Sequence, residues 1–255
     1  MFPYRRGGAT TCLLLLAIAC VLSCVSVAAA RPAPTTTMLH GGAVVSRYSF
    51  FPGKPRWVRL RRPMVLTYAL SKTATVGYLP RDAVRAVLRS AFARWAEAIP
   101  VSFAETERYG AADITVGFYA GDHDDEDAFT GPQTVFAHAF EPEDGRLHFN
   151  AQNHWAVDLS ADSSPDAVDL ESVATHEIGH ILGLDHATSV SSVMYPYISL
   201  RERKVQLSGD DVQGIQELYG VNPNFSFTSY FKPHHEPPAT RFWGLGLAYL
   251  LLAPF

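Results

Sequence analysis

The segment from 176 to 186 constrains this chain most, because it repeats histidine at spacings of four and six residues. It reads His-Glu-Ile-Gly-His-Ile-Leu-Gly-Leu-Asp-His. On a helix, His176 and His180 would project from one face. Gly183 permits a sharp turn after that helix, which predicts that His186 comes back toward the other two. We therefore predict a catalytic Zn²⁺ held by three neutral imidazoles, with a fourth position open for water.

Glu177 lies between the first two histidines and is not needed as a ligand. A carboxylate there can take a proton from a water activated by the metal and pass it to a leaving amine, so we predict a general base and acid. Each histidine alone is better interpreted as a surface or satisfied core residue. Three at these spacings, with Glu177 and the glycine in register, favour a metal site.

Residues 192–196, Ser-Val-Met-Tyr-Pro, follow the third histidine at short range. With this segment the chain resembles the metzincin zinc proteases, whose zinc motif precedes a methionine turn beneath the metal. The Met-Tyr-Pro form and residues 207–220 resemble the matrixins, or matrix metalloproteinases, and particularly their plant members. The alternatives are astacin-like, serralysin-like and adamalysin-like enzymes. The resemblance covers about residues 48–224 and implies that Met194 is a structural floor, not a ligand.

A second set of histidines lies in and after the acidic loop that begins near residue 121. His123, Asp125, His138 and His148 supply three imidazoles and one carboxylate, the number of ligands in a closed tetrahedral zinc site. Matrixins hold a structural zinc with the pattern His-x-Asp, His, His, and these positions match it. Asp124 is the rival carboxylate but breaks the two-residue spacing. The alternative is an acidic, solvated loop with incidental histidines.

The resemblance also implies a calcium site in this loop. The family places an aspartate before Gly-Pro and two carboxylates just after the last structural histidine. This chain has Thr130, Asn150 and Asn153 at those positions. Because Ca²⁺ binding relies on carboxylate oxygens, we predict a weakened or absent site. Asp113 matches another calcium position of the family, and Gly131 is a further candidate calcium ligand.

Hydrophobic spacing gives the order of the predicted elements. A helix over 80–98 buries one face, since its apolar residues recur at spacings of four and three. Strands are expected at 66–70, 101–105, 112–119, 135–140 and 146–150. An active-site helix follows, with Asp169 as its cap, and Ser208 with Asp211 starts a last helix. We predict an α/β (α+β) metzincin-like domain, a twisted mixed sheet with two long helices and a short C-terminal helix.

The cleft is expected along residues 135–139. In matrixins an extended substrate pairs with this edge strand through main-chain hydrogen bonds. Residues 195–204 would wall the pocket for the side chain after the cut bond, and the resemblance implies a large apolar residue there. The expected partner is an extended protein or peptide, and the expected state is a monomer.

Residues 1–30 are interpreted as a secretory signal peptide. Arg5 and Arg6 precede an apolar run that ends in small residues, although an uncleaved membrane anchor is the alternative. Residues 31–47 form a short remnant pro-region that lacks the Pro-Arg-Cys-Gly motif of matrixins. The three cysteines lie at 12, 20 and 24, so removal of the signal leaves no thiol to bind zinc.

The catalytic domain is assigned to residues 48–222 and a tail to 223–255. The tail ends in an apolar stretch after a polar spacer, which is typical of a GPI-attachment signal; the alternative is a disordered or partner-bound end. The net charge of −4 argues against a nucleic-acid surface. We predict a secreted, extracellular zinc endopeptidase. The rival is a metal-stabilised binding module with little turnover, and two zinc ions per chain would favour a matrixin over most other metzincins.

Overall fold

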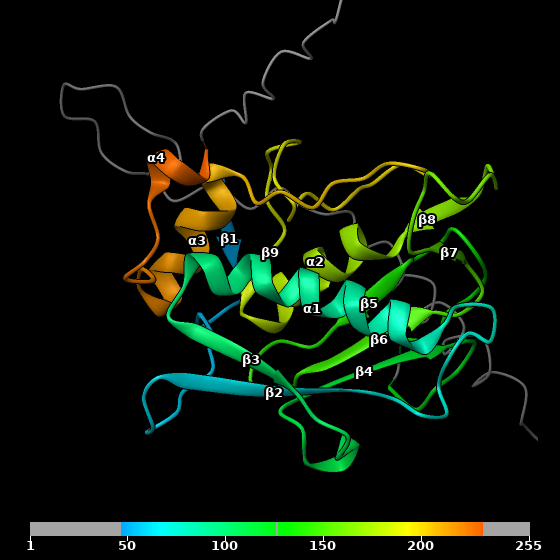
Figure 1. Cartoon of the computed structure of the whole chain (residues 1–255), viewed down its shortest axis with the longest axis horizontal. Helices are drawn as coiled ribbons and strands as arrows, with labels where there is room; N and C mark the ends of the chain where they lie inside the picture. Colours follow the sequence, from blue (N-terminus) through cyan, green and yellow to red (C-terminus); the bar gives the residue numbers. More distant parts are fainter. Residues whose placement is uncertain (1–46, 126, 232–255) are drawn as a thin grey trace, which may run out of the picture. The chain divides into compact units, whose positions relative to one another are not determined.

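The computed structural model describes residues 47–125 and 127–231, and its centre is a five-stranded sheet in the order β3-β2-β4-β6-β5 (Figure 1). The strands are β2 (Met64–Leu70), β3 (Val101–Glu105), β4 (Ile114–Tyr119), β5 (Ala137–Ala139) and β6 (Arg146–Asn150). The first four in spatial order are parallel, whereas β5 runs antiparallel to β6 at one edge. The predicted mixed sheet is confirmed.

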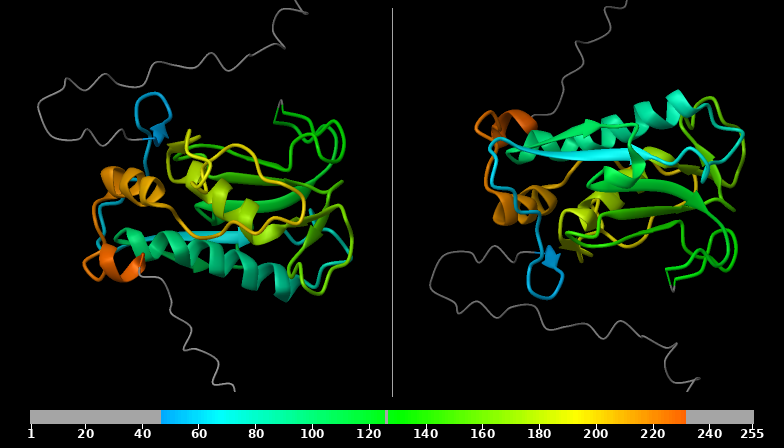
Figure 2. Two further views of the ribbon diagram at one scale, coloured as in Figure 1. Left: turned by 90° about the horizontal axis from the view of Figure 1, so that it is seen from above. Right: turned by 90° about the horizontal axis from the view of Figure 1, so that it is seen from below.

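Helix α1 (Arg81–Ala98) packs with α2 (Leu170–Ile181), and both helices lie above β2, β3 and β4 in Figure 1; Figure 2 shows the same helices from above and from below. Pro80 precedes α1 and Pro100 follows it, as the sequence predicts, because proline cannot continue a helix. Trp95 is fully buried between the helices, and its Nε1 donates to the carbonyl of Thr175 at 2.9 Å. The tryptophan therefore joins the two helices by packing and by a hydrogen bond.

Helix α2 begins where its cap was predicted. The carboxylate of Asp169 accepts from the backbone N–H of Ser172 at 2.8 Å, which satisfies one free donor of the first turn. The preceding residues form β8 (Ala167–Asp169), which pairs with β7 (His154–Ala156), and the helix begins at Leu170. All of α2 except His176 is buried, as its position between α1, the sheet and the following turn requires.

Helix α3 (Gly209–Tyr219) starts with the predicted capping box between Ser208 and Asp211 and ends at Gly220, whose φ is +83°. At 11 residues this predicted last helix is almost as long as α2, and it is followed by a four-residue helix that was not predicted, α4 (Phe227–Tyr230). A 3-10 turn, η1, spans Tyr109–Ala111.

A further pair of strands joins distant parts of the chain. β1 (Ser49–Phe50) runs antiparallel to β9 (Leu184–Asp185), which lies directly before His186. The hydroxyl of Ser49 also donates to the carbonyl of His186 at 2.6 Å. The segment near residue 49 is therefore fixed beside the end of the histidine motif.

None of the helices within 47–125 and 127–231 has the length and apolar character needed to cross a bilayer. The predicted signal peptide (1–30), nearly all of the pro-region (31–47) and the apolar end of the tail lie outside the described residues.

Candidate metal centre and cleft

The histidine motif forms a cluster of three ring nitrogens at the end of α2. Nε2 of His180 lies 3.1 Å from Nε2 of His176 and 3.3 Å from Nε2 of His186. Gly183 makes the turn between them with φ +102°, and a Cβ at this position would overlap the carbonyl oxygen of Pro55. The turn therefore needs glycine both for its conformation and for its close packing.

The hydrogen bonds of Nδ1 in His176 and His180 determine the tautomer of each ring. Nδ1 of His176 lies 2.7 Å from the carbonyl of Val193, and Nδ1 of His180 lies 2.8 Å from that of Leu184. A carbonyl only accepts, so each Nδ1 carries the proton and each Nε2 offers a lone pair to the cluster. Burial lowers the pKa of His176 to about 4 and that of His180 well below its usual range, so both rings are neutral at pH 7.

This donor set fits zinc. The Nε2 lone pairs of His176 and His180 have no proton to share between them, whereas a cation bound there with Nε2 of His186 as third ligand would satisfy both. The set matches a catalytic site, in which three protein ligands leave one position open.

Glu177 lies beside this cluster in an unusual state for a carboxyl group. It is 5% exposed, and burial raises its pKa to about 8. Within the described residues its Oε2 is buried and has no hydrogen-bond partner. A buried acceptor without a donor costs free energy, which indicates a functional rather than a stabilising role.

Met194 lies on a buried turn packed under α2. A Cβ at Gly179 would overlap Sδ of Met194 and come within 3.0 Å of Cζ2 of Trp95. Glycine therefore lets the methionine turn approach the helix between the first two histidines. The role of Met194 as a structural floor stays a prediction, and the contact shows only that its sulfur packs against the helix.

Asp211 is a residue whose importance the sequence did not reveal beyond its place in a capping box. It is 0% exposed, and its carboxylate accepts from the hydroxyl of Ser192, the N–H of Val193 at 2.9 Å and the N–H of Ser208 at 2.7 Å. Through these bonds α3 holds the methionine turn in place. An acidic residue three positions after a serine predicts the contact with Ser208. No local pattern predicts the contacts of Asp211 with Ser192 and Val193.

We expect Gly179→Ala to lower Tm by roughly 2–10 °C. Overpacking costs about 1–3 kcal/mol, and the better helix propensity of alanine offsets at most ~1 kcal/mol. The matched control is Gly77→Ala, since nothing lies within 4 Å of a Cβ there. Differential scanning calorimetry of both variants measures the effect. A Gly179→Ala protein that melts with the wild type would contradict this account of the turn.

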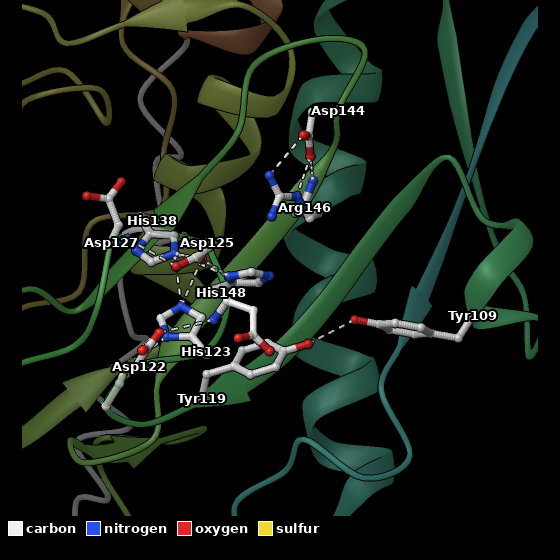
Figure 3. Close-up of polar contacts among 12 residues, drawn as sticks. Tyr109, Tyr119, Asp122, His123, Asp125, Asp127, His138, Asp144, Arg146 and His148 are labelled. Atoms are coloured by element: carbon white, nitrogen blue, oxygen red, sulfur yellow. Dashed lines mark hydrogen bonds and ion pairs between the residues drawn. The ribbon is translucent and has the colours of Figure 1, made fainter.

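The second cluster gathers around the carboxylate of Asp125 (Figure 3). Its Oδ2 lies 2.9 Å from Nε2 of His123, 2.8 Å from Nε2 of His138 and 2.7 Å from Nδ1 of His148. The ligand atoms of these four side chains all lie within 4.8 Å of one another. Asp124, the rival carboxylate, is not part of the group and has φ +64°.

The charges of this cluster suit a metal. Burial raises the pKa of Asp125, but hydrogen bonds from His138 and His148 outweigh it and lower the value to about 2. Burial lowers the pKa of His148 to about 4. Nδ1 of His123 is 2.8 Å from the carbonyl of Gly121, which leaves its Nε2 for the cluster. One anionic carboxylate and three imidazoles fit a closed structural zinc site.

The candidate calcium ligands do not come together. The carboxylate of Asp113 accepts from the N–H and hydroxyl of Thr67, each at 2.7 Å, and pairs with Arg59 at 2.8 Å. Asp113 directly precedes β4, whereas Gly131 contacts Asn150, which pairs with Tyr119 at the other end of that strand. At ~3.3 Å per residue, the length of β4 separates them, so they would have to belong to two different calcium positions.

A cleft of about 530 Å³ connects the three-histidine cluster with the sheet edge. Glu177 opens into it, β5 and residues 133–136 form one wall, and residues 195–198 form the other. Within the described residues β5 is paired only with β6, so its outer main-chain groups face this cleft. An extended peptide could therefore add to the sheet beside the metal cluster.

These features together define a metzincin-type domain. They are a helix with two ligands, a glycine turn that brings back the third, a buried glutamate and a methionine turn. Comparison with known proteins narrows this class. The chain belongs to the matrixin family, because the family model described as Matrixin matches residues 56–220. The resemblance to plant matrixins is also confirmed.

Metalloendoproteinase 4-MMP of Arabidopsis thaliana is 50% identical over 196 residues, 77% of this chain and 56% of that protein. Metalloendoproteinase 1-MMP of the same plant is 50% identical over 185 residues, 72% of this chain and 50% of the relative. Stromelysin-1 of Equus caballus is 39% identical over 187 residues, 70% and 36% of the two chains. The chain thus spans about half the length of the plant relatives it matches.

Proposed function

We propose that this protein is a zinc-dependent endopeptidase that hydrolyses internal bonds of extracellular proteins bound in extended form. The observation that carries the proposal is the buried carboxyl of Glu177, whose Oε2 has no hydrogen-bond partner among the described residues, next to three converging imidazoles. A zinc ion with a purely structural role would not need this carboxyl group. The names of the relatives, which are metalloendoproteinases, support the same conclusion.

Zinc bound by His176, His180 and His186 would polarise the peptide carbonyl and make a water molecule more acidic. The ionised form of Glu177 accepts a proton from that water as the water oxygen adds to the carbonyl carbon. Glu177 then delivers the proton to the amide nitrogen as the C–N bond breaks, so one water is consumed for each bond cut. The open edge of β5 aligns the substrate main chain, and Met194 supports the histidines from below.

A second zinc held by His123, Asp125, His138 and His148 would be structural. Its ligands come from the loop after β4, from β5 and from β6. The ion would thereby attach the loop to the strand that borders the cleft.

We further propose that the protein is secreted and monomeric. Residues 1–30 would be the signal peptide, 31–47 a short pro-region, 48–222 the catalytic domain and 223–255 a tail that carries a GPI-attachment signal. The support is the charge and hydropathy pattern of the sequence at its two ends.

The metal content gives the first test. We expect two zinc ions per purified chain by elemental analysis, one in His148→Ala, and two in the control His154→Ala, whose ring pairs with Asp162 away from both clusters. Chelation should abolish cleavage of a quenched peptide with an apolar residue after the scissile bond, and added zinc should restore it. A folded protein that holds two zinc ions yet cuts no peptide would favour a binding module instead.

A further inference from the structure

The loop of residues 131–136 links the second metal cluster to the cleft, and two buried amide side chains hold it. Residues 133–136 line the cleft next to Glu177. Asn150, at the end of β6, is 0% exposed, and Asn153 is 4% exposed. Both are far more buried than asparagine usually is, so their hydrogen bonds have to be accounted for in full.

Asn150 connects the two ends of this loop. Its Nδ2 donates to the carbonyl of Gly131 at 2.9 Å and to the carbonyl of Val135 at 3.0 Å, which uses both N–H groups of the amide. Its Oδ1 accepts from the N–H of Gln152 at 3.0 Å, and its backbone N–H donates to the carbonyl of Phe136 at 2.9 Å. Every polar group of the Asn150 side chain therefore has a partner.

Asn153 fixes the middle of the same loop. Its Oδ1 accepts from the N–H of Gln133 at 2.7 Å, and Gln133 has φ +61°, a conformation that a non-glycine residue rarely adopts. The hydrogen bond holds the loop in this conformation. Together the two asparagines contact the loop at its beginning, middle and end.

Calcium does not fit this arrangement. It takes six to eight oxygen ligands, with carboxylates to balance its charge. Here two loop carbonyls point at an N–H₂ group, which carries partial positive charge and occupies the place between them. The positions where matrixins have carboxylates hold amides, and the remaining one, Thr130, is exposed.

We propose that Asn150 and Asn153 replace calcium in this protein, so that the 131–136 loop is ordered without the ion. One amide nitrogen joins two carbonyls that a cation would otherwise join. An aspartate at position 150 would have nearly the same shape. Its carboxylate would repel the two carbonyl oxygens that the amide of Asn150 binds through hydrogen bonds. Only a cation would then offset them, so the choice of amide or carboxylate at this position decides the calcium requirement.

The test compares the full-length, zinc-loaded protein in calcium-free buffer and in buffer with calcium, by calorimetry. The wild type should keep its Tm and show no heat of calcium binding. Asn150→Asp should have a Tm roughly 5–10 °C below that of the wild type in calcium-free buffer. The reason is the loss of two hydrogen bonds and the burial of a charge. Calcium should restore most of the lost Tm, whereas magnesium should not. Asn224→Asp, the same change on an exposed side chain, should match the wild type.

A rise of the wild-type Tm with calcium would overturn the proposal. So would an Asn150→Asp protein that is as stable as the wild type in calcium-free buffer. If Asn150→Asp does not fold in either buffer, Asn153→Glu carries the same comparison, and the wild-type titration decides independently. These readouts measure stability, so they stand whether or not the protein proves to be a peptidase.

Discussion

Replacement of Glu177 by glutamine is expected to abolish peptide cleavage while both metal clusters stay loaded. Glutamine keeps the shape of the side chain but cannot take up and release a proton. The loss of general acid–base catalysis should lower kcat/KM by about 10²–10⁴-fold. The measurement is the rate on the quenched peptide, with zinc content determined on the same sample.

The stability of this variant separates a chemical role from a structural one. The Glu177 carboxyl is buried, and its Oε2 has no partner in the part of the chain that the structure describes, so a neutral amide should leave Tm unchanged or raise it. The control Glu107→Gln, which alters an exposed carboxylate, should keep full activity. If Glu177→Gln retained more than about a tenth of the wild-type kcat/KM, this side chain would not be the acid–base group.

The largest expected loss of stability comes from Asp211→Ala. The change leaves the N–H groups of Val193 and Ser208 and the hydroxyl of Ser192 without their buried acceptor. Hydrogen bonds to a charged group contribute about 1.5–3 kcal/mol each and are not additive, so we expect the free energy of unfolding to fall by roughly 3–5 kcal/mol. Urea denaturation of the zinc-loaded protein measures this loss.

The neighbouring carboxylate provides the control. Asp210 lies in the same first turn of α3 but is only partly buried, so Asp210→Ala should lose at most ~1 kcal/mol of interaction with the helix dipole. A double-mutant cycle with Ser192→Ala would isolate the bond between α3 and the methionine turn. Equal effects of the two aspartate substitutions would contradict the anchoring role of Asp211.

Local signals explain which elements the sequence predicts well. The limits of α1 follow from Pro80, Pro100 and the apolar spacing between them, all of which act within the helix itself. The strands β1 and β9 are two residues each and pair across more than a hundred residues, so neither carries a pattern of its own. The strands β7 and β8 have three residues each and were not predicted for the same reason.

The residues of the site also differ in whether local sequence patterns predict their positions. His176 and His180 are predictable because four residues on a helix make them neighbours whatever the rest of the fold does. The set around Asp125 depends on a loop and two strands, and it was predicted only because the sequence resembles a family that has it. The sequence alone shows that positions 150 and 153 lack carboxylates. It does not show how the amide of Asn150 is oriented, because that orientation depends on carbonyl groups that only the folded loop brings near it.

The pairing of His138 with His148 has a consequence for strand register. These residues are opposite each other in β5 and β6, and both reach the cluster around Asp125. A strand of three residues has little to prevent it from slipping along its neighbour, and a slip of one position turns every side chain to the other face. A metal bound by both histidines forbids that slip. Such an ion would thereby decide which main-chain groups of β5 are presented along the open edge, without touching whatever binds there.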